Sequence, residues 1–270
     1  MKTAITLCQV EQAAAGPFVF RQPLAEAFAL AARLGFDAVE LFLPGAEFIS
    51  VGEVRALADQ HGLAIAAVGT GAGMLRHGLS LTDPSPARRA EALAFVASLV
   101  EFGGELGAPA ILGSMQGRWG GEVPRGQALD WLAEALAAAG EAAAAHGVAF
   151  IYEPLNRYET NLINRLSEGA EFLAERDLTN VVLLADLFHM NIEEQDLAGS
   201  IIQASRHVGH VHYADSNRQA MGLGHTDPGP VIAALRAINY AGYLSAEIFP
   251  LPDPESAARQ TLISIHSHTA

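Results

Sequence analysis

Residues 31–43 read AARLGFDAVELFL, in which a helical stretch stops at Gly35 and a run of strand-forming residues follows. Glycine at such a position supplies the left-handed backbone with which helices commonly end, and it makes a short loop into the strand. The same order of helix, glycine and strand recurs at Gly62, Gly147 and Gly242. This recurrence predicts a chain built from repeated helix–strand units.

Eight short apolar runs are candidate strands, and helical patterns separate them. Spread over 270 residues, eight units have roughly 34 residues each, which is the size of a βα unit. The runs show little alternation, as expected when both faces of a parallel sheet are covered. We expect strands at 4–10, 38–43, 64–68, 110–114, 149–153, 181–187, 208–213 and 243–248. Eight units without a leftover domain favour an α/β fold, a single (β/α)8 TIM barrel over residues 1–270, over an open doubly wound sheet.

Several predicted helices carry start signals. Ser50 with Glu53 has the spacing of a capping box. Ser85-Pro86 and Asp253-Pro254 each put a capping residue before a first-turn proline. We therefore expect helices to begin at these three places.

The charge of the chain limits what it can bind. Asp and Glu number 30 against 16 Lys and Arg, for a net charge of −14, and no run of four or more basic residues interrupts this acidity. We therefore expect no nucleic-acid partner. No apolar run reaches the roughly 18 residues that span a bilayer. The run 4–10 is cut off by Glu11 and Gln12 before the apolar part of a secretory signal is complete. These features predict a cytoplasmic protein without a membrane partner.

The scarcest residue types exclude further mechanisms. Cys8 is the only cysteine, so the chain can form no internal disulfide, and its apolar strand pattern indicates a buried small side chain rather than a nucleophile. Lys2 is the only lysine and stands ahead of the first expected strand. A Schiff-base aldolase or a pyridoxal enzyme would therefore have no internal amine.

Two glycine-rich segments have a superficial likeness to cofactor motifs. Residues 69–74 read GTGAGM, in which Met74 takes the place of the third glycine of a dinucleotide-binding fingerprint. Residues 113–121 contain no Gly-Lys-Ser/Thr, so they are not a phosphate-binding loop. Both segments are predicted to be βα loops at an active site.

Ligand-type side chains stand at the ends of the last four expected strands: Glu153, Asp186, His212 and Glu247. In a barrel the chemistry lies where the strands end, and neighbouring strands are about 4.8 Å apart, so these side chains should converge. Three crowded carboxylates repel one another, and a divalent cation relieves that repulsion. The pattern therefore predicts a metal site; four unrelated residues satisfied by neighbouring loops are the alternative.

The donor set indicates which metal to expect. Three carboxylates and one imidazole favour Mn²⁺, with Co²⁺ and Mg²⁺ as alternatives and Zn²⁺ as a further one. His210 shares strand parity with His212 but lies one layer deeper. It is predicted to be a hydrogen-bonded histidine of the barrel core.

Four segments of the second half carry a family resemblance. They are EPLNRYETN at 153–161, DLFHMN at 186–191, the stretch 212–218, and GLGH at 222–225. In these segments the chain resembles the ketose 3-epimerases, such as D-tagatose 3-epimerase and D-psicose 3-epimerase, among the xylose-isomerase-like barrels. The first half agrees in strand order and offers no specific motif.

The resemblance implies a metal-dependent sugar isomerase or epimerase that inverts C3 of a free ketose through an enediolate. The implied ligands of one divalent metal ion are Glu153, Asp186, His212 and Glu247. The implied sugar contacts are Glu159, His189 and Arg218. Epimerisation needs a base on each face of the carbon, and Glu153 and Glu247 are the expected catalytic pair. The resemblance also implies a homodimer or homotetramer.

Residues of the first half are less informative. Phe42 and Trp119 are candidate walls of a sugar pocket, and Gln116 and Arg118 are candidate polar contacts, with loop packing as an equal alternative for each. Glu40 is expected either behind the metal ligands or at the rim of the site. These positions would decide which sugar is bound, and the sequence leaves that sugar, and its phosphorylation, open.

Other activities use related barrels. Hydroxypyruvate isomerase and inosose-processing enzymes share the metal ligands, and the continuation RYET at 157–160 favours the epimerases over them. Endonuclease IV acts on DNA and needs more strand-end histidines and a basic face, whereas this chain is acidic. A sugar-binding barrel without catalysis would be expected to lose one of the paired glutamates, and both are present.

Overall fold

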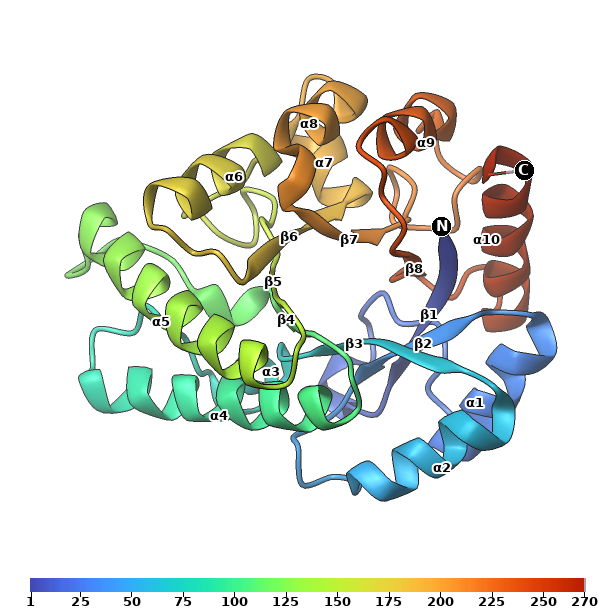
Figure 1. Ribbon diagram of the computed structural model, residues 1–270, viewed down its shortest axis with the longest axis horizontal. Helices are drawn as coiled ribbons and strands as arrows, with labels where there is room; N and C mark the ends of the chain where they lie inside the picture. Colours follow the sequence, from blue (N-terminus) through green and yellow to red (C-terminus); the bar gives the residue numbers. More distant parts are fainter. Residues whose placement is uncertain (270) are drawn as a thin grey trace.

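The computed structural model describes residues 1–269, and eight parallel strands in this part of the chain close into a barrel (Figure 1). Strand order around the barrel follows chain order, and β1 pairs with β8 to close it. The strands are β1 (Lys2–Cys8), β2 (Ala38–Phe42), β3 (Ala64–Gly69), β4 (Ala110–Leu112), β5 (Phe150–Tyr152), β6 (Val181–Asp186), β7 (Val208–His212) and β8 (Tyr243–Ala246). The predicted (β/α)8 TIM barrel is confirmed.

Helices surround the strands and connect each strand to the next (Figure 1). They are α1 (Leu24–Leu34), α2 (Val51–His61), α3 (Ala72–His77), α4 (Pro86–Glu105), α5 (Arg125–Ala145), α6 (Leu166–Glu175), α7 (Leu187–Glu193), α8 (Leu197–Ala204), α9 (Pro228–Ala237) and α10 (Pro254–Thr269). Short 3-10 turns are η1 (Glu11–Ala13), η2 (Ser114–Gln116) and η3 (Ser205–His207). Within residues 1–269, no helix combines the length and apolar character needed to cross a membrane.

The predicted helix starts are confirmed. Ser50 caps α2: its hydroxyl accepts from the Glu53 backbone N–H, and the Glu53 carboxylate accepts from the Ser50 N–H. Helices α4 and α10 begin at Pro86 and Pro254. Gly35 and Gly62 end α1 and α2 with φ of +98° and +65°, a backbone that favours glycine.

Some predicted boundaries are wrong. Helix α9 ends at Ala237 rather than beside Gly242, and Asn239, with φ of +58°, supplies the left-handed residue. Strand β1 begins at Lys2, because the Lys2 N–H donates to the Gly242 carbonyl and extends the ladder with β8. The other strands differ from prediction by one or two residues at an end, since pairing and loop geometry, rather than composition, decide where a ladder stops.

Small and branched apolar side chains pack in the barrel interior. One interior cluster contains Ala4, Ala38 and Ala66, and another contains Ala67, Ile111, Ile151 and Leu184. Two larger clusters fill the space between barrel and helices. Cys8 is buried, as predicted, and burial raises the pKa of its thiol. Polar side chains are thus left to gather at the carboxyl ends of the strands.

Candidate active site

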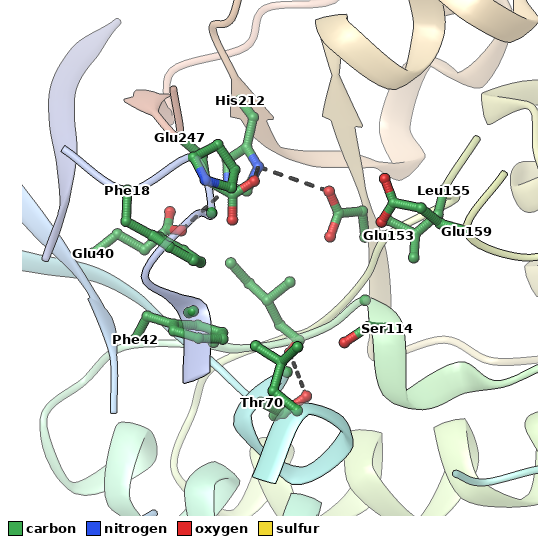
Figure 2. Close-up of a pocket in the computed structure, with 18 of the residues that line it drawn as sticks. Phe18, Glu40, Phe42, Thr70, Ser114, Glu153, Leu155, Glu159, His212 and Glu247 are labelled. Atoms are coloured by element: carbon green, nitrogen blue, oxygen red, sulfur yellow. Dashed lines mark hydrogen bonds and ion pairs between the residues drawn. The ribbon is translucent and has the colours of Figure 1, made fainter. Parts of the chain in front are cut away.

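The four strand-end residues predicted from the sequence meet at the carboxyl end of the barrel; Figure 2 shows three of them, Glu153, His212 and Glu247. Glu153 follows β5, Asp186 ends β6, His212 ends β7 and Glu247 follows β8. From the His212 Nδ1 atom, Asp186 Oδ2 is 3.3 Å away, Glu247 Oε2 3.6 Å and Glu153 Oε1 3.7 Å. Four consecutive strands therefore place three carboxylates around one ring nitrogen.

The donor set fits a divalent cation. One ligand atom each of Glu153, Asp186 and His212 lie within 4.8 Å of one another, and all three residues are buried. Glu153 Oε1 has no hydrogen-bond partner among residues 1–269 although it is buried. Glu247 lies beside this group and pairs with Arg218. A buried carboxylate oxygen without a partner is costly, so the position of Glu153 Oε1 fits a site that holds a cation.

The pKa values of the three carboxyl groups of the site are shifted in different directions by burial and by nearby charges. Burial raises the pKa of Glu153 well above its usual range; His212 opposes this rise, while Glu247 and Asp186 add to it. Burial also raises the pKa of Glu247, against the opposing charges of Arg218 and His212. Burial would raise Asp186 too, but the nearby histidines and Arg218 outweigh it and lower its pKa. Asp186 is thus kept ionised, while the two glutamates can carry protons.

The His189 ring directs an N–H toward the carboxylates of Glu153 and Asp186. Its Nδ1 atom faces two donors of Asn156, the side-chain Nδ2 at 2.7 Å and the backbone N–H at 3.4 Å. Nδ1 therefore accepts, and the ring proton sits on Nε2. Nε2 lies 3.7 Å from Glu153 Oε1 and from Asp186 Oδ2, and it has no hydrogen-bond partner among the described residues. Asn156 was not singled out in the sequence, although it belongs to the 153–161 string.

Arg218 and Glu159 complete the polar side of the site. Arg218 Nη2 pairs with Glu247 and lies 3.6 Å from Asp186 Oδ2, while Nη1 is 3.7 Å from Glu159 Oε1. The Arg218 guanidinium also lies over the Phe188 ring, 4.8 Å from its centre. The Glu159 side chain is 41% exposed, which puts it at the mouth. All seven predicted site residues therefore meet at one end of the barrel.

Asp215 holds the loop that carries Arg218. Its carboxylate accepts backbone N–H groups of Ser216, Gly222, Gly224 and Thr226 at 2.7–3.0 Å. Arg218 has φ of +59°, and its carbonyl accepts from the Phe249 N–H. A strained residue of this kind persists only where its surroundings fix it. Asp215 was not predicted from the sequence. Its partners are backbone N–H groups, which almost any residue type can supply, so no sequence motif marks them.

The bonds to Asp215 predict a pH dependence of stability. Although burial opposes it, the four backbone N–H groups lower the pKa of Asp215 to about 2 from a usual 3.8. A carboxyl with a lowered folded-state pKa stabilises the fold above about pH 4 and loses that contribution as pH falls toward 2. Of about 2 kcal/mol, roughly 1 kcal/mol should disappear between pH 5 and pH 3. Urea unfolding of the wild type and of Asp215→Asn at both pH values measures it; parallel pH profiles would contradict this role.

A cavity of about 280 Å³ opens beside the carboxylates, and its far wall is apolar (Figure 2). Phe18 and Phe42 stack there with ring centres 4.5 Å apart. Arg21 secures the loop that carries Phe18, because its guanidinium donates to the carbonyls of Ala13 and Gly16. Phe42 is thus a wall residue, as one of its two readings expected. Phe18 was missed, since its contact with Phe42 joins segments that the sequence pattern does not link.

The glycine-rich segment 69–74 makes room for this wall. A Cβ added at Gly69 would lie 2.8 Å from the Phe42 ring, and one at Gly71 would lie 3.1 Å from it. A Cβ at Gly73 would lie 2.5 Å from the sulfur of Met115. The predicted active-site loop therefore lies against the cavity, and its glycines permit close side-chain packing.

Gly69→Ala should destabilise the protein. The new methyl group would have to displace the Phe42 ring, and such overpacking typically costs about 1–3 kcal/mol. Gly126→Ala is the matched control, because Gly126 lies in α5 and a Cβ there meets nothing within 4 Å. That change should leave stability unchanged or raise it by up to about 1 kcal/mol. Denaturant unfolding of both variants decides, and equal stability would refute the packing role.

Three other candidates of the first half turn out to hold loops. Gln116 is buried; its amide donates to the carbonyls of Gly113 and Glu153, and its oxygen accepts from Tyr152. The Arg118 guanidinium donates to the Tyr158 carbonyl. The Trp119 indole N–H and backbone N–H both donate to Asn161. None of the three lines the described cavity, so for them the loop-packing alternative holds.

Known proteins match the chain in sequence and in structure. Residues 28–266 match the model of the xylose isomerase-like TIM barrel family. A D-psicose 3-epimerase of Ruminiclostridium cellulolyticum is 33% identical over 225 residues, which cover 81% of this chain and 75% of that protein. A 3-dehydro-D-guloside 4-epimerase of Escherichia coli is 39% identical over 123 residues, 45% of this chain and 47% of that protein. The solved structure of D-psicose 3-epimerase with D-tagatose, from Clostridium cellulolyticum H10, matches with a TM-score of 0.84 and 25% identity over 99% of both chains.

Proposed function

The chain belongs to the xylose isomerase-like TIM barrel family and, within it, to the ketose 3-epimerases, and from this premise we propose that it inverts C3 of a free ketose. The observation that carries the proposal is the pair of buried glutamates, Glu153 and Glu247. Both have raised pKa values, and both lie beside a cavity of small-molecule size. Two such groups are what removal and return of one proton on opposite faces of a carbon require.

The proposed metal ligands are Glu153, Asp186, His212 and Glu247. The orphaned Glu153 oxygen and the oxygen-rich donor set support this assignment, and the donor chemistry favours Mn²⁺ over Co²⁺ or Mg²⁺. When bound, such a cation makes the proton next to a carbonyl more acidic by stabilising the charge that its removal leaves.

The remaining roles belong to the side chains around the cavity. Glu153 and Glu247 would each take or give the C3 proton, and the substrate epimer decides which of them acts first. The His189 Nε2–H and the Arg218 guanidinium would donate to the developing oxyanion. Glu159, at the mouth, would accept from a hydroxyl far from C3 and orient the sugar. The apolar wall of Phe18 and Phe42 would contact the C–H groups of the sugar beyond C3.

A small panel of sugars tests the proposal. The purified protein is incubated with D-fructose, D-tagatose and D-psicose, with and without added Mn²⁺, and products are separated by chromatography. We expect the C3 epimer of at least one of these ketoses to form. Turnover of a 3-keto-glycoside at C4, with none of the ketoses changed, would assign the chain to the activity of its 4-epimerase relative instead.

We further propose that residues 1–270 form one domain, that the protein is cytoplasmic, and that it associates as a homodimer or homotetramer. One closed sheet that runs from β1 to β8 supports the single domain. A lone, buried cysteine is compatible with a reducing compartment. Sedimentation and cell fractionation test the last two points, and a monomer at micromolar concentration would reject the association.

A further inference from the structure

Glu40 reaches across the barrel to two histidines. It lies on β2, whereas His210 and His212 lie on β7, with β1 and β8 between these strands. Glu40 Oε2 is 2.8 Å from His210 Nε2, and Oε1 is 3.1 Å from His212 Nε2. All three residues are at most 5% exposed. The carboxylate thus has each oxygen occupied by one imidazole, in agreement with the predicted core role of His210.

This arrangement determines which way the His212 ring faces. An ionised carboxylate only accepts hydrogen bonds, so the His212 Nε2 atom must carry the proton that Glu40 accepts. The Nδ1 atom is then the one that faces Asp186, Glu153 and Glu247. Among these carboxylates it carries a proton, because the nearby carboxylates outweigh burial and raise the pKa of His212 well above its usual range. A bound cation would take the place of that proton, and Nδ1 would offer its lone pair to the cation. His210 fills the second oxygen of Glu40 and so fixes the carboxylate itself. The planes of the two rings are inclined at 81° to each other, and each ring donates to a different oxygen of Glu40.

The buried location of Glu40 would cost stability if its role were only structural. On the neighbouring strands its paired residues are Thr6 and Ala67, and small and branched apolar side chains fill other parts of the interior. A buried charge is costly even when it is paired, and apolar residues of similar volume often replace such groups without loss of stability. A group that orients a metal ligand, by contrast, changes metal affinity or activity by about 10- to 100-fold when it is removed.

We propose that Glu40 is a positioning residue that holds the His212 ring and its proton so that Nδ1 faces the three carboxylates, with His210 holding Glu40 in turn. The inference rests on the proposed metal site. Glu40 also lies at the cavity wall, and the inference assigns it the role of holding His212 rather than a contact with the substrate, because each of its oxygens already accepts from one histidine.

Metal binding by the apoprotein tests this role directly. Mn²⁺ is titrated calorimetrically into metal-free wild type, Glu40→Ala and Glu40→Gln. We expect the dissociation constant to rise about 100-fold in Glu40→Ala and about 10-fold in Glu40→Gln, whose amide can serve only one imidazole in the native way. At saturating Mn²⁺ most of kcat should return. Thr6→Val is the matched control, because it removes a buried hydrogen bond in the same barrel layer without touching a histidine, and its affinity should stay within about twofold.

The outcomes distinguish a failure of this inference from a failure of the proposed metal site. Wild type that binds no Mn²⁺ would reject the proposed metal site and the inference together. Wild type that binds, with an unchanged affinity in folded Glu40→Ala, would overturn the inference alone. Unchanged affinity with kcat lost would place Glu40 among the reacting groups and also overturn it. As a second readout, the downfield imidazole N–H signal of His212 in the Mg²⁺-loaded protein should be present in the wild type and absent in Glu40→Ala.

Discussion

Replacing Glu247 by Gln is expected to lower kcat by about 10²- to 10⁴-fold, and Glu153→Gln should do the same. An amide keeps the shape of the side chain but cannot carry a proton between the enzyme and C3. Burial raises the pKa of both carboxyls, so each takes up a proton more readily than an exposed glutamate does. Steady-state kinetics with the preferred ketose measure the effect.

A matched control and a metal assay make this loss interpretable. Glu255→Gln changes a partly exposed glutamate on α10 that pairs with Arg33 and Arg259, and its kcat should stay unchanged. Because Glu153 and Glu247 are also proposed ligands, bound metal is measured in each variant. A Glu→Gln variant that retains both its metal and near-normal turnover would remove that glutamate from the catalytic pair.

Metal removal is the second large effect, and we expect chelation followed by dialysis to lower activity by at least about 10³-fold. Adding Mn²⁺ should restore activity. The fold should survive the treatment, since Arg218 and His212 lie among the carboxylates and offset part of their repulsion. Loss of a ligand present at about 100 times its dissociation constant costs about 2.7 kcal/mol, or roughly 5–10 °C in Tm for a chain of this size.

Elemental analysis must accompany the activity measurement. Full activity in protein that holds less than a few percent of one divalent ion per chain would reject the metal site. Activity that returns with Zn²⁺ and not with Mn²⁺ would retain the site and correct the proposed ion.

The sequence predicted the site residues of the second half of the barrel better than those of the first half. Glu153, Asp186, His212 and Glu247 could be predicted to converge because barrel topology alone brings consecutive strand ends together. No comparable rule links Glu40 to His210, which lie 170 positions apart. Their contact depends on side chains that cross the barrel interior.

Contacts made by loops were also not predicted from the sequence. Phe18 meets Phe42 only because one βα loop folds over the end of the next strand, and Asp215 acts through backbone N–H groups that leave no motif. The glycines of 69–74 could be excluded as a dinucleotide motif, but their packing against Phe42 required the structure. Residues that act through spatial neighbours were therefore the ones that the sequence did not reveal.

The position at which solvent hydrogen enters the sugar tests the central proposal most directly. The enzyme and a ketohexose are incubated in D₂O, and both epimers are analysed by NMR. If Glu153 and Glu247 act on the two faces of C3, deuterium should appear at C3 of both epimers while C1 keeps its hydrogens. Deuterium at C1 alone would contradict the account and assign a 1,2-isomerase.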